Sequence, residues 1–319
     1  TYADYTASGR ALGFIEDFVR DQVLPSYANT HTESSGTGLQ TTRLREEARQ
    51  IIRDAVRGDD DTVVLFAGSG STGAIAKLIG VLGLRIPSVL DDALALSEHI
   101  PPGRRPVVFI GPYEHHSNEI PWRESIADVV TIRQDIDGGV DLVDLREQLE
   151  KHADRPLKIG SFSAASNVTG IVSDTFGIAE LLHAHKALSF WDFAAAAPYV
   201  DVTMPALEGR PLSYKDAVFI SPHKFIGGPS TPGVLVARRE LFANRVPDVP
   251  GGGTVAYVND DDHQYLADPT QREEGGTPAI IESIRAGLVF QLKQAVGTAT
   301  IREQEERHLR HAVRAWQSE

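Results

Sequence analysis

The most chemically informative segment of the chain is residues 221–224, Ser-Pro-His-Lys, which directly follow the apolar run Ala217–Ile220. A lysine just beyond a buried strand has its ammonium group partly removed from water, and desolvation lowers the pKa of an amine. A free amine condenses with carbonyl groups, which makes Lys224 a candidate Schiff-base lysine. The alternative is an ordinary surface lysine in a loop.

A loop of small residues, 67–73 (Ala-Gly-Ser-Gly-Ser-Thr-Gly), follows the apolar run Thr62–Phe66 and leads into a helical pattern. Backbone N–H groups at such a helix start, together with the hydroxyls of Ser71 and Thr72, form a candidate anion cradle. No Gly-Lys-Ser/Thr follows, so the loop is not a Walker A motif. A plain tight turn is the alternative.

Two adjacent histidines, His115 and His116, follow the run Pro106–Ile110. Consecutive side chains on an extended segment point in opposite directions, which disfavours a shared metal ion. Stacking on an aromatic ring or acid–base work is the favoured interpretation. Metal ligation and a structural role are the alternatives.

Two more polar side chains follow apolar runs. Asn167 can donate and accept, which suits a phenolic oxygen, although an Asn that satisfies its own turn fits equally well. Asp192 ends the run Ala187–Trp191, and a carboxylate there requires a cationic partner. A pyridinium nitrogen is one such partner, as in pyridoxal phosphate enzymes; an arginine is the alternative.

Short, continuously apolar runs are typical of strands buried on both faces of a parallel sheet. With interleaved helical patterns they predict a doubly wound α/β fold, and a seventh strand, Gly233–Ala237, is expected to be antiparallel. Ligands of such sheets bind beyond the carboxyl ends of the strands, where all the polar segments above lie. The six parallel strands expected are Thr62–Phe66, Pro106–Ile110, Asp128–Ile132, Leu157–Ser161, Ala187–Trp191 and Asp216–Ile220.

Apolar periodicity predicts four helices and one long loop. Residues 1–30 are expected to form an arm and a helix, 31–278 the main domain, and 279–319 a long helix leading towards a C-terminal domain that this chain lacks. The arm is expected to begin as a strand at residues 1–5. The predicted helices are Ala11–Leu24, Arg43–Val56, Asp141–His152 and Ala279–Trp316, the last with bends at Gly287 or Gly297, and the predicted loop is 246–276.

The composition restricts the classes of function. A net charge of −13 over 319 residues argues against nonspecific binding to nucleic acid or to an anionic membrane. No run approaches the roughly 20 apolar residues that span a bilayer, and no secretory leader is visible. The absence of cysteine excludes disulfides and a thiol nucleophile within this chain. We therefore expect a cytoplasmic protein.

The order of these segments resembles the class V aminotransferase family of fold-type I pyridoxal phosphate enzymes, most closely its cysteine desulfurase and selenocysteine lyase-like branch. Residues 114–122 (Glu-His-His-Ser-Asn-Glu-Ile-Pro-Trp) are similar to the family's Glu-His-His-Ala-Asn-x-x-Pro-Trp, and 221–224 follow its Ser-x-His-Lys pattern. The remaining matches are residues 4–7, 66–75, 166–170, 251–253 and 274–278 (Glu-Gly-Gly-Thr-Pro).

The resemblance implies roles for nine residues around pyridoxal 5'-phosphate. Lys224 would form the Schiff base and later remove the Cα proton of an amino acid held as an external aldimine. His115 would stack on the pyridine ring and Asp192 would pair with its nitrogen. Thr277 would reach the phosphate of a neighbouring subunit, which implies a homodimer with shared sites. The other implied cofactor contacts are Ser71, Thr72, Ser221 and His223 at the phosphate and Asn167 near the ring hydroxyl.

Two departures from the family pattern affect the expected reaction. Ala195 stands where the family has a glutamine that contacts the ring oxygen, and Gly73 stands where it has a glutamate. The resemblance places the desulfurase cysteine and the arginine that binds the substrate carboxylate in a C-terminal domain. Cleavage of a C–S or C–Se bond is the leading expectation. An aminotransferase, an epimerase and a non-catalytic cofactor-binding module are the alternatives.

Overall fold

A seven-stranded sheet forms the centre of the molecule in the computed structural model, which describes residues 2–30 and 34–317. Its strand order is β1-β7-β6-β5-β4-β2-β3, and β7 runs antiparallel to both of its neighbours while the others share one direction. All seven predicted strands, the antiparallel one included, are confirmed. Their bounds are β1 Thr62–Ala67, β2 Val107–Ile110, β3 Asp128–Thr131, β4 Lys158–Ser163, β5 Leu188–Asp192, β6 Ala217–Ile220 and β7 Gly233–Arg238.

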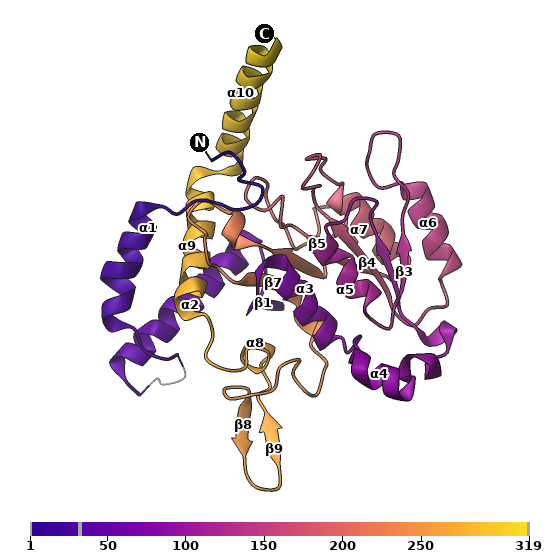
Figure 1. Cartoon of the computed structure of the whole chain (residues 1–319), viewed down its shortest axis with the longest axis horizontal. Helices are drawn as coiled ribbons and strands as arrows, with labels where there is room; N and C mark the ends of the chain where they lie inside the picture. Colours follow the sequence, from indigo (N-terminus) through magenta and orange to yellow (C-terminus); the bar gives the residue numbers. More distant parts are fainter. Residues whose placement is uncertain (1, 31–33, 318–319) are drawn as a thin grey trace.

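Helices cover both faces of the sheet, so the expected doubly wound fold is confirmed (Figure 1). Alternate residues of each strand enter two separate hydrophobic clusters: Val64 of β1 packs on one face, and Val63 and Leu65 pack on the other. One face is covered by α2 Gly36–Ala55, α6 Leu142–Lys151, α7 Thr175–Ala184 and α9 Ile280–Val296, and the other by α3 Gly70–Val81 and α5 Ile120–Arg123. Burial on both faces explains why the strands are continuously apolar.

The N-terminal segment differs from the prediction. The expected strand at residues 1–5 is wrong for residues 2–5, which form an arm and a turn; Thr1 lies outside the described residues. The arm contacts the 3₁₀ helix η6 Pro222–Lys224 instead of the sheet, since the Gly9 N–H donates to the carbonyl of His223 at 2.8 Å. The expected helix is present in three parts: α1 Gly13–Phe18, the π-helical η1 Val19–Val23 and the 3₁₀-helical η2 Leu24–Ser26.

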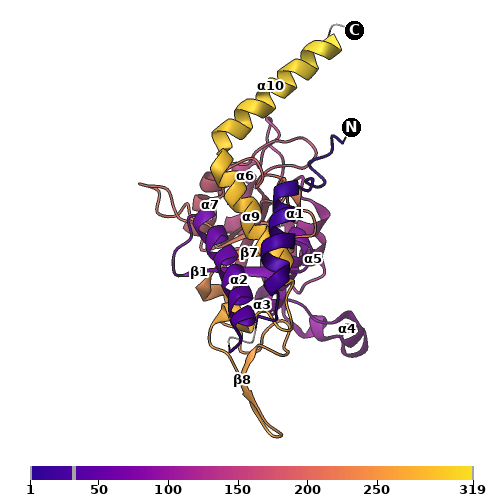
Figure 2. The same cartoon turned by 90° about the vertical axis from the view of Figure 1, so that its left-hand side faces the viewer.

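The long C-terminal helical stretch breaks once, at one of the two predicted glycines. Gly297, with φ of 83°, separates α9 from α10 Thr298–Gln317. The other glycine, Gly287, lies inside α9, which continues through it. A Cβ at this position would lie 2.5 Å from Cβ of Ala48, so the glycine allows α9 to pack closely against α2. None of the residues of α10 is buried, and the helix projects away from the sheet (Figures 1 and 2).

The predicted loop at 246–276 contains regular structure. A hairpin of β8 Val255–Val258 and β9 His263–Tyr265 projects from the molecule, and α8 Pro269–Arg272 follows it (Figure 1). The side chain of Asn259 closes the hairpin turn by accepting from the N–H groups of Asp261 and Asp262. The two strands are short and lie among glycines and acidic residues, so no alternation of apolar and polar residues could be recognised in the sequence.

The remaining short helices are α4 Ser88–Leu94, η3 Leu96–His99, η4 Pro102–Arg104, η5 His116–Asn118, η6 Pro222–Lys224 and η7 Arg239–Leu241. Within the two described ranges, no helix combines the length and the apolar character that crossing a membrane takes. The domain boundaries near residues 30 and 278 stay predictions.

Candidate active site

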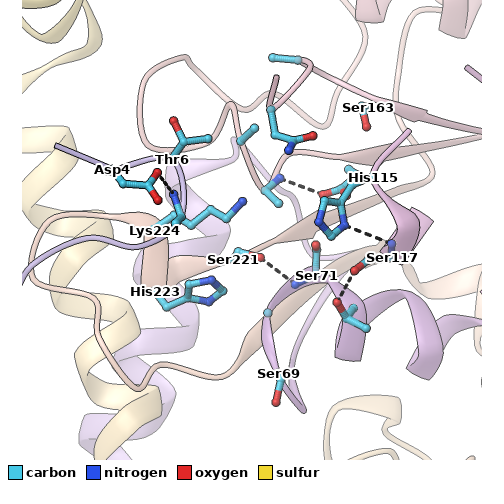
Figure 3. Close-up of a pocket in the computed structure, with 18 residues that line it drawn as sticks. Asp4, Thr6, Ser69, Ser71, His115, Ser117, Ser163, Ser221, His223 and Lys224 are labelled. Atoms are coloured by element: carbon cyan, nitrogen blue, oxygen red, sulfur yellow. Dashed lines mark hydrogen bonds between the residues drawn. The ribbon is translucent and has the colours of Figure 1, made fainter. Parts of the chain in front are cut away.

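A cavity of about 590 Å³ lies at the carboxyl ends of β4, β5 and β6 and at the start of α3. Eight of the nine predicted site residues line it, which places side chains from distant parts of the sequence around one space (Figure 3). These eight are Ser71, Thr72, His115, Asn167, Asp192, Ser221, His223 and Lys224.

Lys224 projects into the cavity from η6, just after β6 (Figure 3). Desolvation lowers the pKa of its amine, and the carboxylates of Asp192 and Asp4 oppose that effect. An amine that is partly shielded from water and faces two carboxylates is unlike an ordinary surface lysine. Its surroundings favour the neutral, nucleophilic form more than water does.

The glycine loop forms a cradle at the start of α3. The Ser71 N–H donates to Oγ of Ser221 at 2.8 Å, which joins the loop to the segment that carries Lys224. Gly70, with φ of +55°, leaves the cradle open, since a Cβ there would lie 2.8 Å from both His223 Cε1 and Ser221 Oγ. Helix N–H groups, hydroxyls and a nearby imidazole suit a phosphate group, so the residues fit that part of the expected cofactor. Desolvation lowers the pKa of His223.

Asp192 ends β5 with 4% of the residue exposed, and its Oδ1 accepts from the Ala194 N–H at 2.8 Å. Among the residues that the structure describes, no Lys, Arg or His nitrogen lies within ion-pair distance of this carboxylate, so the alternative of an arginine partner is wrong. Burial raises the pKa of Asp192, and the positive charges of Lys224 and His115 act against that rise. A buried carboxylate that faces the cavity in this way fits the nitrogen of a pyridinium ring.

The two histidines separate as the sequence predicts: His115 lines the cavity, and His116 is not among the lining residues. Nδ1 of His115 accepts from the Ser117 N–H at 3.1 Å, so a neutral imidazole carries its proton on Nε2. No cluster of three or more His, Asp or Glu side chains suited to a metal ion occurs in residues 2–30 and 34–317.

Asn167 lines the same cavity, and its side chain makes no hydrogen bond to another described residue. The alternative, in which Asn167 satisfies its own turn, is wrong: Ser166 holds the turn, since its Oγ accepts from the N–H groups of Val168 and Thr169. The amide of Asn167 is therefore available to a ligand.

Thr277 is the one predicted site residue that lies outside the cavity. It is exposed, and its Oγ1 accepts from Nδ2 of Asn29 at 3.3 Å. This position is compatible with the expectation that Thr277 serves a neighbouring subunit.

The cavity also contains side chains to which the sequence analysis gave no role: Asp4, Thr6, Ser69, Ser117 and Ser163. Four of them, Asp4, Thr6, Ser69 and Ser117, stand inside the segments that match the family, which is the signal that points to them. Ser163 is the last residue of a buried strand, and its contact with Glu114 depends on a fold that brings β2 and β4 together.

Comparison with known proteins agrees with this fold and site. Residues 1–318 match the family Aminotransferase class-V, so the chain belongs to that family, and the predicted resemblance is confirmed. Members of this family depend on pyridoxal phosphate. The protein is therefore a pyridoxal phosphate-dependent enzyme.

Several relatives are cysteine desulfurases. The chain is 27% identical over 316 residues to the cysteine desulfurase of Dickeya dadantii, covering 98% of this chain and 70% of that protein. It is 24% identical over 308 residues to a probable cysteine desulfurase of Pyrococcus abyssi, covering 95% of this chain and 69% of that protein. The apo structure of the cysteine desulfurase of Thermococcus onnurineus NA1 matches with a TM-score of 0.79 at 22% identity, covering 99% of this chain and 72% of that one.

Proposed function

We propose that the enzyme cleaves the C–S or C–Se bond of an amino acid, with Lys224 as the group that moves the Cα proton. The position of the Lys224 amine supports this proposal most strongly. It is desolvated, lines the cavity and faces the carboxylates of Asp192 and Asp4. Relatives named as cysteine desulfurases along the whole chain support this choice of bond.

The cavity offers a separate group for each part of the cofactor. The start of α3, with Ser71 and Thr72, would hold the phosphate together with Ser221 and His223. His115 would stack on the ring, and Asn167 would meet the ring hydroxyl. Asp192, to which no described residue gives a cationic partner, would hold the proton of the ring nitrogen. When bound, the cofactor supplies an electron sink for negative charge at Cα.

Lys224 would hold the cofactor covalently and would then serve as the base. Its lowered pKa keeps a larger share of the amine neutral near pH 7 than an exposed lysine has, which is the form that accepts a proton from Cα. Asp192 and Asp4 stabilise the ammonium that results. This pairing allows one side chain to take up the proton and to return it.

The test is exchange of the substrate Cα proton in D₂O. We expect the wild-type enzyme to exchange the Cα proton of cysteine or selenocysteine and to release sulfide or selenide. Lys224→Ala should retain the cofactor non-covalently and lose exchange by a factor of at least about 10². Undiminished exchange in Lys224→Ala, with the protein folded and loaded, would contradict the assignment.

A second candidate, an aminotransferase or an epimerase, is favoured by one observation. None of the 319 residues is cysteine, so this chain supplies no thiol to receive a sulfur atom. The products distinguish the two candidates. Released sulfide or selenide indicates bond cleavage, a 2-oxo acid that retains its sulfur or selenium indicates transamination, and the opposite enantiomer indicates epimerisation.

The proposal includes a cytoplasmic homodimer with shared active sites. The exposed position of Thr277, outside its own chain's cavity, supports a contact with the cofactor phosphate of the partner subunit.

A further inference from the structure

The carboxyl group of Glu114 has an unusual set of partners beside the cavity. Its Oε1 accepts from the N–H groups of Gly111 at 3.2 Å and Ser163 at 2.9 Å. Its Oε2 accepts from Nδ2 of Asn118 at 2.7 Å and from Oγ of Ser163 at 2.6 Å. Four donors therefore surround the group, and no described lysine, arginine or histidine forms an ion pair with it.

Three of these four donors cannot reverse their role. The two backbone N–H groups have no lone pair to offer. Asn118 is fixed because its Oδ1 accepts from Nε1 of Trp122 at 3.3 Å and from Oγ of Ser161 at 2.6 Å, which leaves Nδ2 towards Glu114. Only the hydroxyl of Ser163 can either donate or accept.

The protonation state of Glu114 therefore fixes the direction of the Ser163 hydroxyl. When Glu114 is ionised, the hydroxyl donates to Oε2 and presents a lone pair to the cavity that Ser163 lines. When Glu114 takes up a proton from water, the new O–H bond forms at Oε2 and points at Oγ of Ser163. The hydroxyl hydrogen of Ser163 must then turn away from Glu114, towards the cavity.

We propose that Glu114 is a positioning residue that acts through Ser163, so that gain or loss of one proton switches Ser163 between a donor and an acceptor to the cofactor. This inference rests on the proposed function for its ligand, although the switch itself lies within the protein.

The charges around the pair favour a switch near neutral pH. Desolvation raises the pKa of Glu114 to about 7, against the lowering effect of its hydrogen bonds from Ser163 and Asn118. The negative charge of Asp192 on β5 adds to the rise, while Gly111 directly after β2, Ser163 of β4 and Asn118 of η5 present the amide and hydroxyl donors described above. Asp192 pairs in register with Ser163 across β4 and β5, and it also faces Lys224 and His115.

The test follows the carboxyl group by infrared spectroscopy and the cofactor by absorbance, each against pH, in the cofactor-free and loaded enzyme. We expect a protonated-carboxyl band with a midpoint near pH 7, and an inflection of the cofactor absorbance at the same pH. Glu114→Gln should abolish both. Ser163→Ala removes a donor to the ionised form, so it should raise the carboxyl midpoint by about one pH unit or more and abolish the absorbance inflection.

Ser173→Ala is the matched control, because Oγ of Ser173 donates to the backbone carbonyl of Ser163 and does not contact Glu114. It should change neither signal. Should Glu114→Gln fail to fold, Ser163→Ala carries the test alone.

The remaining outcomes distinguish failure of the Glu114–Ser163 switch from failure of the proposed function. A wild-type enzyme without a carboxyl band near neutrality, or an absorbance inflection that survives in Ser163→Ala, would overturn the switch and leave cofactor binding intact. A carboxyl band that behaves as expected in a protein that never binds pyridoxal phosphate would overturn the proposed function while supporting the Glu114–Ser163 pair.

Discussion

Lys224 and Lys215 are both removed from water, but the groups around each lysine differ. Lys224 faces two carboxylates in a cavity. Lys215, with 1% of the residue exposed, has no hydrogen-bond partner for its Nζ, which lies 3.8 Å from the centre of the Phe176 ring. Desolvation lowers the pKa of Lys215 to about 7, and only the charge of Asp174 opposes it. Lys215 therefore opposes folding whenever it is charged.

Replacing Lys215 by methionine should stabilise the protein in a pH-dependent way. The folded-state pKa is below the ordinary 10.5, so stability is lost as the pH falls from about 10.5 to 7 and stays low below that range. Lys215→Met should raise the free energy of unfolding by roughly 2–4 kcal/mol at pH 6, with little gain near pH 10. Denaturant unfolding at both pH values measures this. The exposed Lys151→Met is the control, and an equal effect of Lys215→Met at both pH values would contradict the account.

At the level of single residues, the sequence predicted the groups that follow strands and missed the groups that need a partner from elsewhere. Lys224 and Asp192 were visible because each ends an apolar run. The pairing of Glu114 with Ser163 spans 49 positions and was not visible, since nothing local to either residue indicates it. The Lys215 environment was missed for the same reason.

At the level of elements, Glu274 connects the segment that carries Thr277 to the sheet. Its side chain is 7% exposed, forms ion pairs with Arg45 and Arg49 of α2, and accepts from the Phe66 N–H of β1 at 2.7 Å. Burial alone raises the pKa of Glu274, but the two guanidinium groups outweigh it and hold that pKa below the ordinary value. We call Glu274 and its partners Arg45, Arg49 and the Phe66 N–H the Glu274 clamp. It fixes α2, β1 and the segment that carries Thr277 relative to one another.

Glu274→Gln should destabilise the protein by about 3–5 kcal/mol at pH 7, because it leaves the buried guanidinium groups of Arg45 and Arg49 with only the half-exposed Glu46 as a charged partner. A carboxylate with a depressed pKa contributes stability above its ordinary pKa and loses it as the pH falls through the folded value. The difference in the free energy of unfolding between the wild type and Glu274→Gln should therefore become smaller below about pH 4.5. Thermal unfolding across this range checks it.

The control is Glu240→Gln, because the Glu240 carboxylate is 61% exposed and pairs with Arg238. It should lower the free energy of unfolding by less than about 1 kcal/mol. Equal losses of stability in the two variants would contradict the role of Glu274.

Some helices and strands were predicted from the sequence, and others were missed. The seven strands were predicted because burial on both faces, which is least complete in the edge strand β3, leaves a continuous apolar run. The β8–β9 hairpin was missed because its strands are exposed and flanked by glycine and acidic residues. The break between α9 and α10 was predicted at two glycines, and the sequence could not distinguish Gly297, which breaks the helix, from Gly287, which packs against α2.

At the level of the whole molecule, the proposed role of Thr277 implies a second subunit. Sedimentation velocity should give a mass close to twice 34.7 kDa. Thr277→Ala should leave that mass unchanged and weaken cofactor retention about tenfold, because one hydrogen bond to a charged phosphate is lost. Thr131→Ala, at the end of the edge strand β3, is the control. A monomer that retains its cofactor fully would contradict the shared site.

The central claim is that Lys224 anchors the cofactor, and borohydride reduction followed by peptide mass mapping tests it most directly. Reduction makes the bond between the lysine and the cofactor permanent, so the labelled residue can be identified. We predict that the added mass lies on Lys224 and that Lys215, the other desolvated lysine discussed above, stays unmodified. Label on Lys215, or no label on a folded and cofactor-saturated enzyme, would contradict the account.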